Sequence, residues 1–177
     1  MKKLILTTLL TYSFIISAQT DQRIYDIIDA VSAKRIESDI TTLANFGTRH
    51  TLSDTVSTTR GIGAARRWIK SEFEKTSAEC NGCLNVFYQK DLVKKGANNR
   101  IVKDVEVVNV LAVQKGTKYP NRYIIMSGDI DSRVSDPTNF TDDSPGANDN
   151  ASGMGGTLDA ARVLSKYQFE SSIIYMG

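Results

Sequence analysis

Apolar residues recur along the chain with two different periods, and these periods predict its helices and strands. Spacings of three or four residues predict three helices in the first half, at about 24–31, 36–46 and 62–73. Alternation predicts two strands joined by a hairpin turn, at 84–92 and 105–113. A buried strand at 123–127, a helix and a strand at 172–176 then follow. Such a unit has a right-handed crossover and parallel strands, so the pattern indicates one continuous α/β unit.

Acidic residues stand at the end of this buried strand and at the start of the helix that follows it. Asp129 and Asp131 directly follow the apolar strand, and Asp149 lies in the small-residue segment 146–153, where the helix begins. Open α/β sheets bind ligands beyond the carboxyl ends of their strands. The layout therefore predicts a metal site. The structural alternative is a solvated loop for the first two residues and a helix cap near Asn150 for the third.

Nearby polar residues are given structural roles. The acidic residues Asp136, Asp142 and Asp143 are interpreted as ordinary loop residues. His50 is the only histidine of the sequence, and without a paired motif it is expected to be a satisfied structural residue rather than a ligand. Arg49 is expected to pair with a carboxylate near the site. Asn150 or Ser152 is expected to cap the helix that follows.

Four segments resemble a known family. Pro145–Gly153 and Ala160–Leu164 carry most of the resemblance, and Gly47–His50 and Ala65–Ile69 are weaker matches. Together they resemble the co-catalytic di-zinc exopeptidases of peptidase clan MH, which include the secreted bacterial leucyl aminopeptidases. The resemblance implies a three-layer α/β sandwich with a mixed, largely parallel sheet and flanking helices. It also implies that Asp149 bridges two zinc ions and that Asp131 is the catalytic-site aspartate that orients a neighbouring ligand.

The sequence departs from the family pattern at two points. Asp129 occupies the position of a zinc-binding histidine; a carboxylate also ligates zinc, at about 2.0–2.2 Å, so Asp129 is still predicted to be a metal ligand. Oxygen ligation shifts the preference toward manganese, magnesium or calcium. The family's Glu-Glu pair, which supplies the general base and a further ligand, follows the strand at which this sequence ends. We therefore expect residues 19–177 to be the N-terminal portion of a metallo-exopeptidase domain, inactive by itself.

The first 18 residues have the pattern of a bacterial-type secretory signal. Lys2 and Lys3 precede an apolar stretch at 4–16, and Ser17-Ala18 is the expected cleavage site. The stretch is too short to span a membrane comfortably, so an exported protein (periplasmic, cell-surface or secreted) without stable membrane association is expected. Once these residues are removed, basic and acidic residues are equal in number, and neither nucleic acid nor an anionic membrane is expected as a partner.

Cys80 and Cys83, the only two cysteines, allow three interpretations. A zinc knuckle needs about four ligands, and too few cysteines and histidines are present. A thioredoxin-like pair lies at the start of a helix after a strand, whereas this pair follows a helix. A small-loop disulfide is therefore expected in an exported chain.

Two classes of function remain after other chemistries are compared. Ser152 lacks the glycine context of a serine-hydrolase elbow, and a calcium loop starting at Asp129 would have Phe140 at its terminal carboxylate position. The sequence favours a zinc-dependent aminopeptidase acting on peptides with a free N-terminus. The alternative is a non-catalytic binding or scaffold relative in which the fold persists and the ligands have drifted.

Overall fold

The computed structural model describes residues 21–177, so the predicted signal at 1–18 lies outside the described residues. Helix α2 (Gln22–Asp29) belongs to a separate unit from residues 31–177 and is described by itself. It begins at Asp21, whose carboxylate accepts a hydrogen bond from the backbone N–H of Arg23 at 3.0 Å, as expected of an N-cap. Within residues 21–177, no helix has the length and apolar character needed to cross a membrane.

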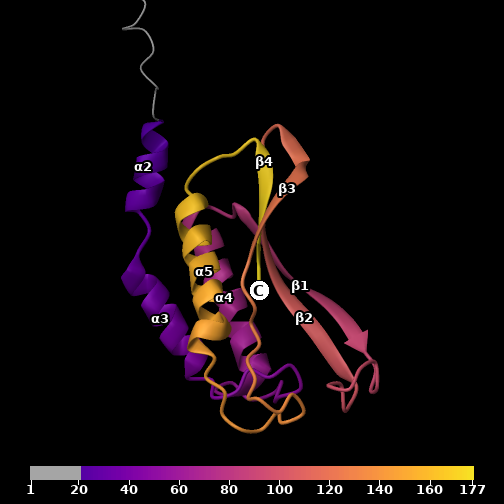
Figure 1. Cartoon of the computed structure of the whole chain (residues 1–177). Coiled ribbons are helices and arrows are strands. Elements are labelled where there is room, and N and C mark those ends of the chain that lie inside the picture. The colour runs from indigo at the N-terminus through magenta and orange to yellow at the C-terminus, as the bar shows by residue number, and fades with distance from the viewer. Residues whose placement is uncertain (1–20) are drawn as a thin grey trace, which may run out of the picture. The chain divides into compact units, whose positions relative to one another are not determined.

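The second unit is built on a four-stranded mixed sheet (Figure 1). Its strands are β1 (Leu84–Val93), β2 (Val105–Gln114), β3 (Tyr119–Ser127) and β4 (Ser171–Met176), in the order β1-β2-β4-β3. β1 and β2 form the predicted antiparallel hairpin. β4 pairs with β2 antiparallel and with β3 parallel. The strand–helix–strand unit therefore has the predicted parallel pair.

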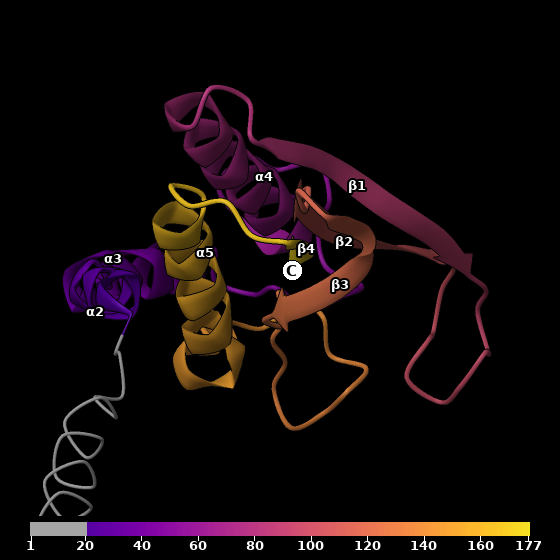
Figure 2. The same ribbon diagram turned by 90° about the horizontal axis from the view of Figure 1, so that it is seen from above.

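Three helices flank one face of this sheet (Figure 2). α4 (Gly61–Glu79) packs against β1 and β2, and α5 (Ser152–Leu164) packs against β3 and β4. α3 (Ala33–Ala44) packs against α5. The predicted α/β class with a mixed sheet and flanking helices is confirmed. The sheet differs from the expected largely parallel one, because among the described strands the hairpin and the β2–β4 pairing are both antiparallel.

The hydrophobic core lies between the helices and this face of the sheet. Ile69 and Phe73 of α4, Leu158 of α5, and Val110 and Tyr175 of the sheet are each at most 1% exposed. Along β2 the buried positions alternate with half-buried ones, because successive side chains of a strand point to opposite faces. The hydroxyl of Tyr175 donates to Oε1 of Gln114 at 2.9 Å, so this buried polar group has a partner.

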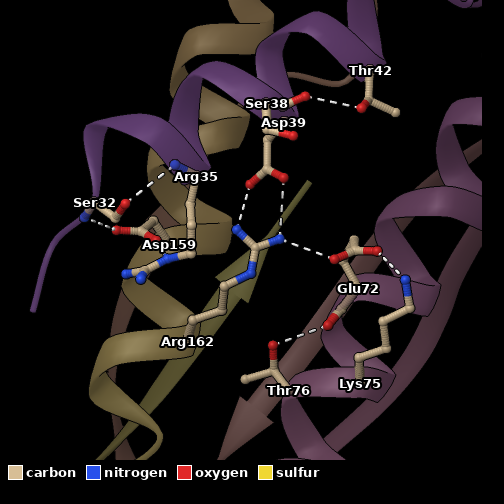
Figure 3. A network of polar contacts seen from close by, with 10 residues as sticks. All are labelled: Ser32, Arg35, Ser38, Asp39, Thr42, Glu72, Lys75, Thr76, Asp159 and Arg162. Carbon is tan, nitrogen blue, oxygen red and sulfur yellow. Dashed lines mark hydrogen bonds and ion pairs between the residues drawn. The ribbon is translucent and has the colours of Figure 1, made fainter.

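An ion-pair network joins the three helices (Figure 3). The guanidinium of Arg162 on α5 donates to both carboxylate oxygens of Asp39 on α3, at 2.5 and 3.2 Å, and to Glu72 on α4 at 3.0 Å. Beside it, Nε of Arg35 donates to the buried carboxylate of Asp159 at 2.6 Å. Buried charges are tolerated when they are paired in this way. The network therefore fixes α3 and α4 against the helix that begins at the acidic segment 146–153.

The exposed edge of the sheet lies on a different strand from the one predicted from the sequence. We expect the 172–176 strand to lie inside the sheet and to lack its next neighbours, but β4 lies between β2 and β3 and has both. β3 is the edge strand instead. Its residues Tyr123, Ile124 and Ile125 are 52%, 57% and 59% exposed. The prediction that 172–176 exposes an apolar edge is therefore wrong, and the exposed apolar edge lies on β3, the strand that leads into Asp129.

Candidate functional site

The candidate site lies where the two parallel strands end. Ser127 of β3 and Met176 of β4 are partners in the register, and the N–H of Gly128 donates to the carbonyl of Met176 at 3.1 Å. Asp129 and Asp131 come next and are exposed, whereas Ile130 between them is only 7% exposed. The buried isoleucine anchors the segment, so that both carboxylates stay on its outer side.

Gly128 brings the first acidic segment against the start of α5. A Cβ atom at this position would lie 2.4 Å from the backbone carbonyl carbon of Gly153 and 2.4 Å from the backbone nitrogen of Met154. Real side chains do not make contacts this short, so any residue other than glycine would push the strand end and the helix apart. The absence of a side chain is therefore what allows the two acidic segments to meet.

The segment that carries Asp149 is an irregular turn. It is a single π-turn, η1 (Ala147–Ala151), preceded by Gly146 with a φ of 50°, a left-handed conformation that glycine adopts without steric cost. The backbone of Asp149 is extended, and its peptide bond to Asn150 is cis. The carboxylate of Asp149 is therefore presented by a turn between Gly146 and α5.

The expected side-chain cap of α5 is absent. The N-cap position is Ala151, without a side-chain hydrogen bond, and the hydroxyl of Ser152 donates to the carbonyl of Asn148 at 2.7 Å. Oδ1 of Asn150 is buried without a hydrogen-bond partner among the described residues. The capping roles expected for Asn150 and Ser152 are wrong, because the π-turn sets the start of the helix. Asp149 does not cap α5 either, so helix capping does not explain its position.

All three aspartates predicted to form the site line one pocket. Its volume is about 610 Å³, and the side chains of the aspartates are exposed to it. Thr51 joins them, because its hydroxyl donates to Oδ2 of Asp131 at 3.2 Å. The other lining residues come from the same two segments: Ser132, Arg133, Val134, Ser135, Gly146, Ala147 and Asn148. The structure thus brings together residues that are about twenty positions apart in the sequence.

Arg49 holds the two segments of this pocket together from below. It is fully buried, and its guanidinium donates to the carbonyl oxygens of Ile130 at 2.8 Å, Pro145 at 2.6 Å, Gly146 at 3.0 Å and Leu43 at 2.8 Å. Burial lowers its pKa to about 10, an effect that the charge of Asp131 opposes.

The carboxylate partner expected for Arg49 is not found among residues 21–177. The acceptors of its hydrogen bonds are main-chain carbonyl oxygens, whose positions cannot be read from a sequence. Five donors in a rigid fork suit such a set of acceptors. Arg49 is therefore a positioning residue for both acidic segments rather than one member of an ion pair.

His50 is a structural residue, as expected. It is 6% exposed, its Nδ1 accepts a hydrogen bond from the N–H of Leu52 at 3.0 Å, and its Nε2 lies 3.1 Å from the carbonyl oxygen of Pro137. Because Nδ1 accepts, Nε2 carries the proton and donates. Both ring nitrogens are thus used within the loops around the site.

Sequence reasoning missed a pair of buried serines below the pocket. The hydroxyl of Ser132 donates to the carbonyl of Ser144 at 2.6 Å and accepts from the N–H of Arg49 at 3.1 Å. Ser144 Oγ lies 3.4 Å from Thr48 Oγ1. The only signal for them is their position, directly after Asp131 and directly before Pro145. They close the base of the loop that connects the two acidic segments.

The donor atoms of the pocket fit a divalent cation only in part. Carboxylate oxygens are suitable ligands for zinc and for harder cations. Within residues 21–177, however, no three Asp, Glu, His or Cys side chains are grouped closely enough to hold a metal ion. A structural zinc site needs about four ligands, and a catalytic one about three and a water. The described residues therefore supply part of a coordination sphere and do not complete one.

Cys80 and Cys83 are joined by a disulfide, with sulfurs 2.04 Å apart. The bond closes the turn between α4 and β1, where Asn81 and Gly82 both have positive φ angles, of 58° and 82°. Residues without a large side chain or with a short polar one tolerate this conformation. The pair is thus a structural element away from the acidic pocket.

The fold resembles that of solved zinc-dependent exopeptidases. A leucine aminopeptidase precursor from Bacteroides thetaiotaomicron superposes with a TM-score of 0.60 at 21% identity, over 82% of this chain and 46% of that one. A glutaminyl cyclase from the same organism superposes with a TM-score of 0.60 at 19% identity, over the same shares of the two chains. At these identities the likeness concerns the fold, which both kinds of enzyme share.

Sequence comparison finds a match to one peptidase family and to curated metalloproteases. Residues 109–176, which include all three aspartates, match the model of Peptidase family M28. A protein of Pyrenophora teres f. teres named "Probable zinc metalloprotease" is 48% identical over 154 residues, covering 87% of this chain and 32% of that protein. The chain is therefore similar to the zinc-dependent exopeptidases and, over residues 109–176, to peptidase family M28, as its sequence motifs predict. It spans about a third of the length of the curated relatives it matches.

Proposed function

We propose that this chain is the N-terminal portion of a metal-dependent exopeptidase domain that hydrolyses the N-terminal peptide bond of its substrates. The observation that carries the proposal is the meeting of Asp129, Asp131 and Asp149 around one pocket at the carboxyl ends of two parallel strands. Ligands of open α/β sheets bind at this position. The family match over residues 109–176 supports a peptidase rather than another use of the fold.

In this proposal each aspartate has a separate role. Asp149 and Asp129 are metal ligands on two different segments, and Asp131, which accepts a hydrogen bond from Thr51, orients the ligand at position 129. A bound metal ion polarises a scissile carbonyl and makes a bound water more acidic. Zinc is the proposed metal, with two ions in the completed site. Arg49 holds the two ligand segments at a fixed separation through the carbonyls of Ile130, Pro145 and Gly146.

The proposed substrates are peptides with a free N-terminus, from which one residue is released at a time. The proposed location is outside the cytoplasm, on the basis of the signal-like residues 1–18 and of the Cys80–Cys83 disulfide, since disulfides persist in oxidising compartments. The described residues do not complete the metal site. We therefore propose that residues 19–177 alone do not catalyse hydrolysis.

The test compares residues 19–177 alone with the same residues fused after Gly177 to the downstream half of the Pyrenophora relative. The substrates are leucyl-nitroanilide and its N-acetylated form, which lacks the free amino group. We expect the fusion to release nitroaniline from the free form only, and a chelator to stop the release. In this proposal the general base comes from the downstream half, and loss of a general base typically costs ~10²–10⁴ in rate, so the chain alone should release none.

Asp149→Asn and Asp136→Asn are a matched pair of variants of the fusion. The first removes a proposed ligand and should abolish turnover, whereas the second changes an exposed loop carboxylate and should leave it intact. Chelator-sensitive turnover by residues 19–177 alone would show that the active site does not need the downstream half. A folded, metal-loaded but inert fusion would favour a non-catalytic binding or scaffold protein instead.

A further inference from the structure

Arg66 is a charged residue on the core-facing side of α4. Its neighbours on this side, Ile62, Ala65, Ile69 and Phe73, are all buried, and Arg66 itself is only 7% exposed. Within residues 21–177 no hydrogen bond or ion pair involves its guanidinium, and Nε is enclosed without a partner. A buried polar group left unpaired destabilises a fold, and more so when it is charged. Arg66 is therefore expected to contribute little or nothing to the stability of the fold.

Arg66 lines two neighbouring cavities. The larger, of about 590 Å³, lies between the loop at 51–55, helix α4 and the β1–β2 hairpin. The smaller, of about 180 Å³, is also lined by Asp129 and Asp131 of the candidate site. Arg66 therefore stands between a pocket on the hairpin side and the acidic segment that follows β3.

Most other charged residues of the larger cavity have polar partners. Glu106 pairs with Lys90 at 3.0 Å, and Asp104 pairs with Lys94 at 2.8 Å. Arg67 donates to main-chain carbonyls at the start of α4, including that of Thr55 at 2.8 Å. Lys103 is exposed, and its ammonium lies over the ring of Phe140, 4.3 Å from the centroid. Arg66 is thus the buried cation of this cavity, and the donors of its guanidinium are unused.

The charge of Arg66 persists in this environment. Burial lowers its pKa, and the charge of Glu106 opposes that effect. Arginine nevertheless stays protonated in proteins at neutral pH. The cavity therefore contains one buried positive charge with a rigid set of N–H donors.

We propose that this cavity binds a carboxylate group and that the guanidinium of Arg66 is its anchor. A guanidinium matches a carboxylate in a bidentate geometry. The one buried, unpaired cation of the cavity balances a single negative charge, and the nearby carboxylates of Asp104 and Glu106 disfavour a doubly charged phosphate. The proposal rests on this cavity alone and does not require the peptidase activity proposed above. Because Arg66 also lines the smaller cavity, the rest of the ligand extends toward Asp129 and Asp131.

The test uses blocked peptides as probes, in a buffer with chelator, so that neither a metal nor turnover is involved. N-acetyl-Ala-Ala has a free C-terminal carboxylate, and its C-terminal amide is the matched neutral probe. N-acetylglutamate α-amide offers a side-chain carboxylate, and inorganic phosphate is the third anion. Binding to the intact chain is followed by NMR, through the ¹H–¹⁵N signal of Arg66 Nε and, for comparison with the variants, through the backbone amide signals of the residues that line the cavity. We expect a shift of this signal with one or both carboxylate probes and at least tenfold weaker binding of the amide.

Three substitutions make the result specific. Arg66→Gln should weaken carboxylate binding at least tenfold, whereas Arg100→Gln, a matched change in the exposed hairpin turn, should not. Arg66→Met should have a thermal midpoint equal to or above that of the parent, because a buried unpaired charge is replaced by a side chain of similar shape. The proposal is overturned if Arg66→Gln binds as the parent does, if the amide binds equally well, or if phosphate binds more tightly than either carboxylate. A large fall in the midpoint of Arg66→Met also overturns it, since Arg66 would then serve the fold.

Discussion

Nη1 of Arg49 donates a hydrogen bond to the carbonyl oxygen of Pro145, 2.6 Å away. The two residues are far apart in the sequence, and this bond fixes the segment before Gly146 to the loop that follows α3. The same side chain reaches Ile130, so one arginine sets the separation of Asp129 and Asp149. Its effect on the proposed metal site is indirect and acts through main-chain atoms.

Arg49→Lys should therefore destabilise the protein although it keeps the charge. One ammonium group cannot reach four carbonyl oxygens, and each buried acceptor left unpaired costs about 1–3 kcal/mol. A loss on the order of 3 kcal/mol in the free energy of unfolding is expected, measured by urea denaturation. Arg133→Lys, at an exposed position of the same pocket, is the control. A loss within about 0.5 kcal/mol, as for ordinary surface changes, would show that the carbonyl contacts contribute little.

The network around Arg162 gives a second prediction. Arg162→Ala leaves the buried carboxylate of Asp39 without its partner, and breaking a buried pair in this way costs about 3–5 kcal/mol. The double variant Arg162→Met with Asp39→Leu removes both charges and should recover most of the loss. Urea denaturation of the single and double variants measures this coupling. Equal stability of the single and double variants would contradict the importance of the pair.

Metal binding should be weak in the chain by itself. We expect calorimetry of residues 19–177 to show no tight, stoichiometric zinc isotherm, because the described aspartates do not complete a coordination sphere. In the fusion with a downstream half, tight binding should appear and should be lost in Asp149→Asn. Tight binding by residues 19–177, abolished by the same substitution, would mean that the site is complete without further ligands.

The buried hydroxyl of Tyr175 should make the free energy of unfolding depend on pH in the alkaline range. Burial raises its pKa above the ordinary value, so the unfolded state ionises first, near pH 10. The unfolded state then binds fewer protons than the folded state, and stability falls as the pH rises above about 10, by up to about 1.4 kcal/mol per pH unit. Tyr175→Phe should be less stable near neutrality by on the order of 1 kcal/mol, because Gln114 loses its partner. Its stability should nevertheless fall less steeply above pH 10, which urea denaturation between pH 9 and pH 11 would show.

Much of this structure follows from patterns that are local in the sequence. The alternation in β1 and β2 and the helical spacing in α4 predict these elements within a few residues of their observed bounds. The acidic segments after β3 and before α5 are the two ends of one loop and line one pocket, at the carboxyl end of the strand where open α/β sheets bind ligands. The insertion of β4 between β2 and β3 is not predicted, since all three strands are apolar and apolar patterns do not specify neighbours.

Contacts to main-chain atoms account for the other errors. The sequence predicts a carboxylate partner for Arg49 and a capping role for Ser152. Both predictions are wrong because side-chain types can be read from a sequence, whereas the positions of main-chain carbonyl groups cannot. Arg66 was hidden for a different reason. It lies within a helix whose apolar stripe is evident, and only the packed structure shows that its guanidinium is enclosed without a partner.

The loop between Ser132 and Ser144 is tied at its base, through the bond between these serines and through Arg49. Its two ends are therefore held independently of its tip, which contains exposed residues such as Asp136 and Asp142. Insertions, deletions or exchanges at the tip can reshape the rim of the acidic pocket without moving the carboxylates themselves. If the proposed function is right, changes in substrate preference are expected to concentrate in this loop, while the proposed metal ligands Asp129 and Asp149 stay in place.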